Sequence, residues 1–208
     1  MYLISIFFDD ATTHQLQLYI DAVAKKTGNL YMTENQVKPH LTIATFHSKH
    51  ENDVVKCFTQ TAQAIETAQT PSAEIIFAAV SAFSSNVICL SAVHNQLLQE
   101  LSAEMYKSIS EISETKWGAR YLPYQWMPHV TIGKHLSSEQ MQEAFITLQQ
   151  QFSLLRGKAV KLELAKTVVR KNVVPENVVL KNVASKTAAM EEDVSAQKER
   201  VILCSFKL

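Results

Sequence analysis

The sequence contains one five-residue pattern twice. Residues 39–43 read Pro-His-Leu-Thr-Ile and residues 128–132 read Pro-His-Val-Thr-Ile, which places one copy in each half of the chain. In a β-strand, residues i and i+2 point to the same face. Each copy therefore presents an imidazole beside a hydroxyl, His40 with Thr42 and His129 with Thr131, while the apolar residues between and after them point toward a core. Two such strands side by side would form a nearly symmetric site.

These residue types suit acid–base chemistry at phosphorus. Histidine titrates near neutral pH, so one imidazole can accept a proton while a second, protonated imidazole donates one. Displacement at a phosphate needs both events, because the nucleophile loses a proton and the leaving oxygen gains one. The hydroxyls of Thr42 and Thr131 could hydrogen-bond the non-bridging oxygens and orient the phosphate. The pattern does not tell which histidine is the base, and nothing in it requires a metal.

Other side chains near the second copy are open to two interpretations. Tyr124 and Trp126 lead directly into it, where they could stack a nucleobase or, equally, pack between parts of the fold. His47 and His135 follow the two pattern histidines, but no carboxylate accompanies them at the spacing of metal ligands. We therefore expect no metal site and no cofactor.

The composition is that of an ordinary globular protein. Among 208 residues, 20 basic residues balance 20 acidic ones, so a nucleic acid would be bound locally and not along a basic face. Three widely spaced cysteines favour a reduced, cytoplasmic protein. The apolar start is short and is followed by Asp9 and Asp10, which indicates a strand and not a signal peptide. The sequence contains no run of about 18 apolar residues, the length that would predict a membrane span. Nothing in it suggests an obligate oligomer, so we expect a monomer.

Hydrophobic periodicity predicts the elements that hold the two copies. Capping-box patterns at 48–51 and 137–140 predict that a helix follows each copy. The predicted strands are 2–8, 39–46, 73–83, 87–93, 128–134, 158–170 and 200–207, and the predicted helices are 10–28, 48–70, 97–109 and 137–152. Because each half contains a pattern strand, a capped helix and a further strand, we infer an internal duplication. Residues 172–199 are expected to be a long loop or insertion.

The paired pattern resembles the signature of the two-histidine (2H) phosphoesterase superfamily, which includes the 2′-5′ RNA ligase-like and 2′,3′-cyclic phosphodiesterase families. The resemblance covers about residues 1–171 and 200–208. It implies an α+β fold of two pseudo-symmetric lobes, each an antiparallel sheet with outer helices, around a central cleft. We therefore expect residues 1–208 to form a single bilobal domain, with the 172–199 stretch as its departure from the family.

The resemblance also implies an activity. The expected function is a metal-independent phosphodiesterase that opens 2′,3′-cyclic phosphates of nucleotides or RNA ends, with His40 and His129 as the acid–base pair and Thr42 and Thr131 on the phosphate. Two alternatives remain at this point. One is a module that binds nucleotides or RNA ends without turnover, and the other is RNA ligation by the same two histidines.

Overall fold

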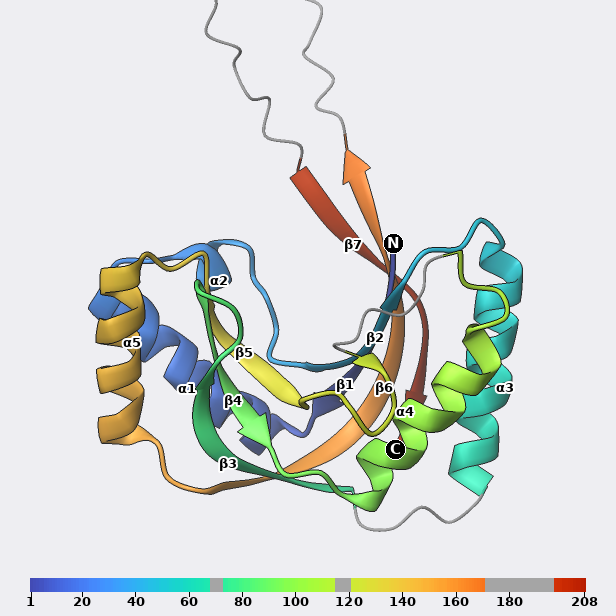
Figure 1. The fold of residues 1–208 in the computed structure, drawn as a ribbon, viewed down its shortest axis with the longest axis horizontal. Helices are drawn as coiled ribbons and strands as arrows, with labels where there is room; N and C mark the ends of the chain where they lie inside the picture. The colour runs from blue at the N-terminus through green and yellow to red at the C-terminus, as the bar shows by residue number, and fades with distance from the viewer. Residues whose placement is uncertain (68–72, 115–120, 171–196) are drawn as a thin grey trace, which may run out of the picture.

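The computed structural model describes residues 1–67, 73–114, 121–170 and 197–208. These residues form five helices and seven strands (Figure 1). The strands are β1 (Tyr2–Phe8), β2 (Leu41–Phe46), β3 (Glu74–Ala82), β4 (Val87–Ala92), β5 (His129–Lys134), β6 (Leu155–Arg170) and β7 (Gln197–Lys207), and the helices are α1 (Asp10–Thr27), α2 (Tyr31–Glu34), α3 (Glu51–Thr67), α4 (Gln96–Ile109) and α5 (Ser138–Gln151). No helix in the described residues has the length and apolar character needed to cross a bilayer.

The predicted elements are all present, with some differences at their ends. The short helix α2 was not expected, because its four residues fall in a stretch that looks like a polar loop. Strands β6 and β7 each begin three residues earlier than predicted, at Leu155 and Gln197. The predicted loop 172–199 therefore overlaps the start of β7, and its remainder, 172–196, lies outside the described residues.

Local capping chemistry explains where two of the helices begin and end. Ser137 caps α5 through the predicted capping box, with Ser137 and Gln140 each bonding the other's backbone N–H. Asp9 caps α1, and Gly28 ends it in the left-handed conformation that glycine adopts without strain. The other predicted capping box is wrong, because α3 begins at Glu51 and the Ser48 hydroxyl accepts from the His50 N–H.

The strands form an antiparallel sheet in the order β1-β2-β5-β4-β3-β6-β7, with a further pairing between β1 and β6. Two connections join its two lobes. Strand β6 pairs with β3 through residues 155–158 and then with β1 through residues 159–166. On the other side, β2 meets β5 through a single register pair, Leu41 opposite Val130. The predicted α+β class and antiparallel strands are confirmed, and the two lobe sheets are continuous with one another.

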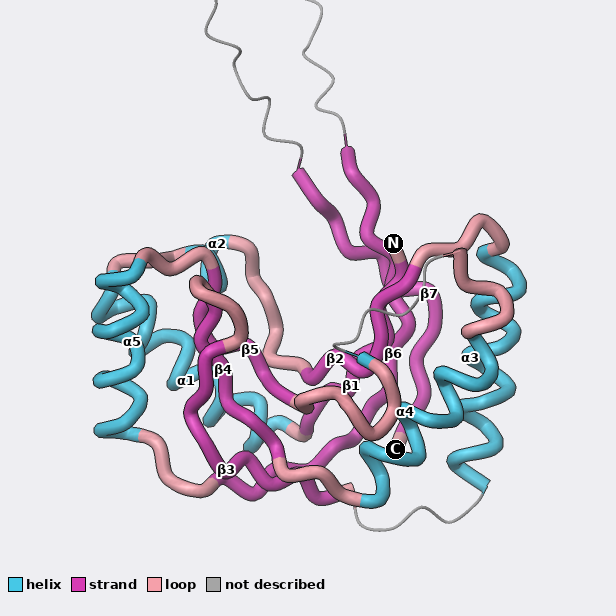
Figure 2. The backbone as a smooth tube through the Cα atoms, in the orientation of Figure 1, coloured by secondary structure: helices cyan, strands magenta, loops and turns pink. Residues whose placement is uncertain are grey.

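The lobes do not correspond to the two halves of the sequence. Apart from the short α2, which follows α1, the order β1-α1-β2-α3-β3 is repeated as β4-α4-β5-α5-β6. Strands β1, β2 and β6 form one lobe, to which β7 is added, and β3, β4 and β5 form the other. Helices α3 and α4 pack together on the first lobe, and α1 and α5 on the second. Each repeat thus contributes its first helix and last strand to the other's lobe, and the helices lie outside with β2 and β5 between them (Figures 1 and 2).

Candidate functional site

The pairing of β2 with β5 brings the two copies of the pattern together. Leu41 lies opposite Val130, and both are fully buried on the core side. Continuing this antiparallel register by one residue on either side places His40 next to Thr131, and Thr42 next to His129. Neighbours across such a pair have Cβ atoms about 4.5–5.5 Å apart, and diagonal ones about 7–8 Å. The two histidines and two threonines therefore share the face opposite the core, arranged around a local twofold axis.

The same local contact fixes each imidazole. His40 Nδ1 lies 2.7 Å from the carbonyl oxygen of Lys38, and His129 Nδ1 lies 2.8 Å from that of Met127. A proline stands between each histidine and its carbonyl partner and restricts the backbone there. Because a carbonyl oxygen only accepts, Nδ1 donates in both rings. Each neutral ring therefore keeps its lone pair on Nε2, the nitrogen left to exchange protons with a substrate.

Neighbouring strands contribute further side chains to this face. Ser5 on β1 pairs with Thr42, and Ser91 on β4 pairs with His129. The Phe7 ring stacks against His40 at a centroid distance of 5.7 Å, and Phe83 stacks against His129 at 4.3 Å. Each imidazole thus has an aromatic neighbour that restricts its rotation.

The lobe around His40 also carries charge. Arg200 reaches from β7 across the sheet, with Nη1 3.5 Å from His40 Nε2 and Nη2 donating to Ser5 Oγ at 3.1 Å. The buried carboxylate of Glu163 on β6 lies 3.7 Å from Arg200 and 2.8 Å from Lys161. The corresponding place in the other lobe holds a hydrogen bond of 2.7 Å between two serine hydroxyls, Ser91 and Ser81.

Both imidazoles titrate below the ordinary histidine range. Burial lowers the pKa of His40 to about 4, with a further contribution from the positive charge of Arg200. The Lys38 carbonyl and Glu163 oppose this effect, and His129 adds a small repulsion. Burial also lowers the pKa of His129, against the opposing bond to the Met127 carbonyl. Both rings of the free protein are therefore neutral at pH 7.

A pocket of about 350 Å³ adjoins His40. One wall is the sheet face formed by β1, β6 and β7, and the other is the segment from α2 to β2. It has aromatic, amide and cationic side chains, which suit a nucleotide or another phosphorylated molecule. The lining residues are Phe7, Tyr31, Asn35, Gln36, Val37, Lys38, Lys161, Glu163, Arg200 and Ile202.

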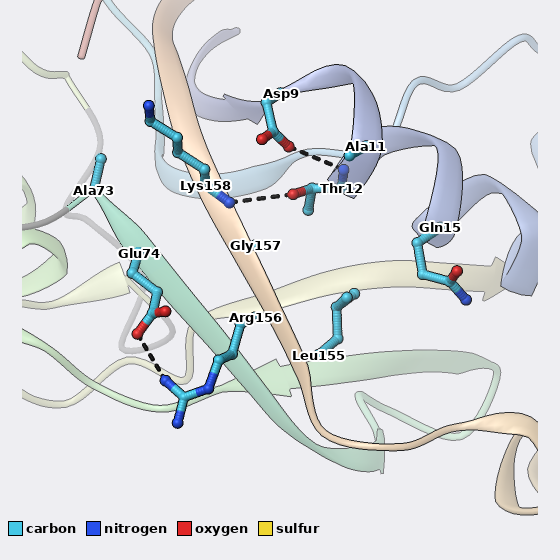
Figure 3. Close-up of a pocket in the computed structure, with 10 residues that line it drawn as sticks. All are labelled: Asp9, Ala11, Thr12, Gln15, Ala73, Glu74, Leu155, Arg156, Gly157 and Lys158. Atoms are coloured by element: carbon cyan, nitrogen blue, oxygen red, sulfur yellow. Dashed lines mark hydrogen bonds and ion pairs between the residues drawn. The ribbon is translucent and has the colours of Figure 1, made fainter.

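A second pocket, of about 510 Å³, lies where β6 passes between β3 and the start of α1 (Figure 3). Several of its polar groups are engaged with one another. Arg156 binds Glu74 at 2.9 Å, and Asp9 accepts from the Thr12 N–H at 2.9 Å. None of the four pattern side chains lines this pocket, so we place the functional site between β2 and β5.

The two aromatic residues that were predicted to stack a base differ in their exposure to solvent. Tyr124 is 75% exposed, and its stacking role stays a prediction. Trp126 is only 2% exposed and meets the His94 ring edge-on, so its burial does not fit the role. Within the described residues, no group of three or more His, Cys, Asp or Glu side chains could hold a metal ion.

Sequence reasoning missed Arg200, Ser5 and Phe7. Ser5 and Phe7 are two residues apart in a correctly predicted strand, so the sequence indicates that they share a face. It does not indicate which strand lies beside that strand. Arg200 stands at the other end of the chain from His40, and no local spacing connects the two.

Comparisons with known proteins agree with the family resemblance of the repeated pattern. The family model described as the 2′-5′ RNA ligase superfamily matches residues 13–170. A structure of Usb1 from Kluyveromyces marxianus aligns at 12% identity over 78% of this chain and 92% of that chain, with a TM-score of 0.44. A structure of the same protein with uridine monophosphate aligns at 11% identity with the same coverage and a TM-score of 0.42. No curated protein matches the chain.

Proposed function

Because the chain belongs to the 2′-5′ RNA ligase superfamily, we propose that it is a metal-independent phosphodiesterase that opens the 2′,3′-cyclic phosphate of nucleotides or RNA ends. The observation that carries the proposal is the β2–β5 register, which puts two Nδ1-anchored imidazoles diagonally across one face with a threonine beside each. A phosphate at the centre of this face would have an Nε2 on either side. That is the arrangement in-line displacement needs, since the proton is removed on one side and delivered on the other.

The chemistry then follows from the four side chains. One neutral imidazole takes a proton from water as the water oxygen bonds to phosphorus. The other imidazole, protonated when the anionic substrate binds beside it, gives its proton to the departing ribose oxygen. Thr42 and Thr131 donate to the non-bridging oxygens, where negative charge accumulates. The pocket next to His40 is the proposed place for part of the nucleoside.

The test is incubation of the purified protein with nucleoside 2′,3′-cyclic phosphates and EDTA, followed by chromatography. We expect a nucleoside monophosphate as product, and a loss of at least about 10²-fold in rate for His40→Ala and for His129→Ala, the usual contribution of one acid or base. Arg156→Gln, which breaks an exposed ion pair in the other pocket, is the matched control and should keep the wild-type rate.

Two outcomes would contradict the proposal. If both histidine variants hydrolyse the substrate at the wild-type rate, the two imidazoles are not the acid and base. If the folded wild-type protein binds the nucleotide without forming product, the site is a binding module.

A further inference from the structure

Arg200 breaks the symmetry of the two-histidine face. It belongs to β7, which follows the duplicated unit and has no counterpart within it, and it lies outside the 13–170 range matched by the family. Its guanidinium lies over the Phe7 ring, 5.5 Å from the centroid, and reaches Nε2 of His40, the ring nitrogen that does not bind the Lys38 carbonyl. The duplication supplies two equivalent imidazoles, and the added strand makes one of them different.

The contact between Arg200 and His40 is compatible with only one protonation state of the ring. A guanidinium carries N–H donors and no acceptor. The Nδ1 atom of His40 already donates to the Lys38 carbonyl. Nη1 of Arg200 can therefore approach Nε2 favourably only when Nε2 bears its lone pair, which is the neutral, proton-accepting form.

Two further side chains, Glu163 and His129, act electrostatically on the His40 ring beside Arg200. Glu163 on β6 favours the protonated ring, but its carboxylate is shared between Lys161 and Arg200. His129 on β5 repels a proton on His40. Within the described residues, no charged side chain shifts the pKa of His129, which responds to burial and to the Met127 carbonyl. A bound phosphate would favour protonation of both rings, and Arg200 opposes this at His40.

We propose that Arg200 is a positioning residue that holds His40 in the neutral form, which assigns proton removal to His40 and proton delivery to His129. This inference rests on the proposed phosphodiesterase activity. In the resulting step, His40 Nε2 takes a proton from the attacking water as the new P–O bond forms. His129 Nε2–H gives its proton to the ribose oxygen as the old P–O bond breaks.

The first measurement is an NMR titration of both imidazoles in the free protein. In Arg200→Gln, we expect the pKa of His40 to move upward by at least about one pH unit, the size of effect that a neighbouring charge exerts. The pKa of His129 should stay in place. Glu163→Gln removes the opposing charge and should move the His40 pKa downward, which tests the same electrostatics if Arg200→Gln does not fold. Arg156→Gln should change neither pKa.

The second measurement is the pH dependence of kcat/KM with 2′,3′-cyclic AMP. The acid limb of this profile reports the group that must be neutral in the free enzyme. Arg200→Gln should move the acid limb to higher pH, so that the variant loses more activity at pH 4.5 than at pH 8, and should leave the alkaline limb unchanged. A merely structural role would lower the rate equally at both pH values.

The outcomes separate this inference from the proposed function. An unmoved His40 pKa in Arg200→Gln overturns the role of Arg200, even if the wild-type protein is active. A shift of the alkaline limb in place of the acid limb overturns the assignment of the two histidines. Absence of hydrolysis by wild-type protein overturns the proposed function and with it the catalytic roles, while the NMR titration still decides whether Arg200 holds His40 neutral.

Discussion

At the scale of single residues, each imidazole is held by contacts that leave one nitrogen to react. The carbonyl two residues earlier anchors Nδ1, an aromatic ring restricts rotation, and the threonine of the other copy lies alongside. The repeated five-residue pattern contains the imidazole, the hydroxyl and the proline that positions the carbonyl, so this much could be predicted from the sequence. The contact of Arg200 with His40 could not be predicted, because it depends on a side chain that reaches the histidine from β7.

The threonines give a prediction at the same scale. Thr42→Val keeps the shape of the side chain but removes the hydroxyl proposed to bind a non-bridging oxygen. We expect kcat to fall about 10²–10³-fold, as for loss of one donor to a developing negative charge, with little change in stability. Steady-state kinetics with 2′,3′-cyclic AMP measures it. Thr45→Val, on the same strand but paired with Leu3, is the matched control. Equal rates for the two variants would remove Thr42 from the site.

At the scale of elements, the helices stabilise the lobes from outside. The capping box of α5 also connects two helices, because the Gln140 side chain donates to the Thr27 carbonyl near the end of α1. The box was predictable because it is a local pattern whose four residues specify one geometry. The similar pattern at 48–51 failed, since α3 starts later and Glu51 instead binds Lys166 at 2.5 Å. Lys166, a residue far away in the sequence, thus binds the Glu51 carboxylate that the predicted capping box would have used.

Removing the α5 cap should therefore destabilise the protein without changing its chemistry. For Ser137→Ala we expect a loss of about 0.5–2 kcal/mol in the free energy of unfolding, because the backbone N–H of Gln140 loses the hydroxyl that accepts from it. Urea denaturation measures the change, and kcat should stay at the wild-type value. Ser138→Ala, one residue inside the helix, should change stability by less than about 0.5 kcal/mol. If the two variants are equally stable, the cap contributes nothing.

At the scale of the whole molecule, the duplication is interlocked. The sequence revealed the repeat through its two pattern strands, but not that each repeat gives its first helix and last strand to the other lobe. That exchange depends on partners far apart in the chain, such as β1 with β6 and α1 with α5. Strand alternation identifies which residues share a face but leaves the neighbouring strand undefined. The site lies where the register pair between β2 and β5 joins the two lobes, and each lobe contains elements from both halves of the chain.

The interlocking predicts that neither half of the chain folds alone. A cut in the β3–β4 turn, between Ser84 and Ser85, yields one fragment with β1, α1, α2, β2, α3 and β3 and another with the remaining elements. In the first fragment, α1 lacks α5, β3 lacks β4 and β6, and β1 lacks β6, so the buried faces of these elements would be exposed to water. We expect each fragment to give the narrow NMR spectrum of an unfolded chain, and an equimolar mixture to recover dispersed signals and hydrolysis. A dispersed spectrum from residues 1–84 alone would show that the first repeat is an independent domain.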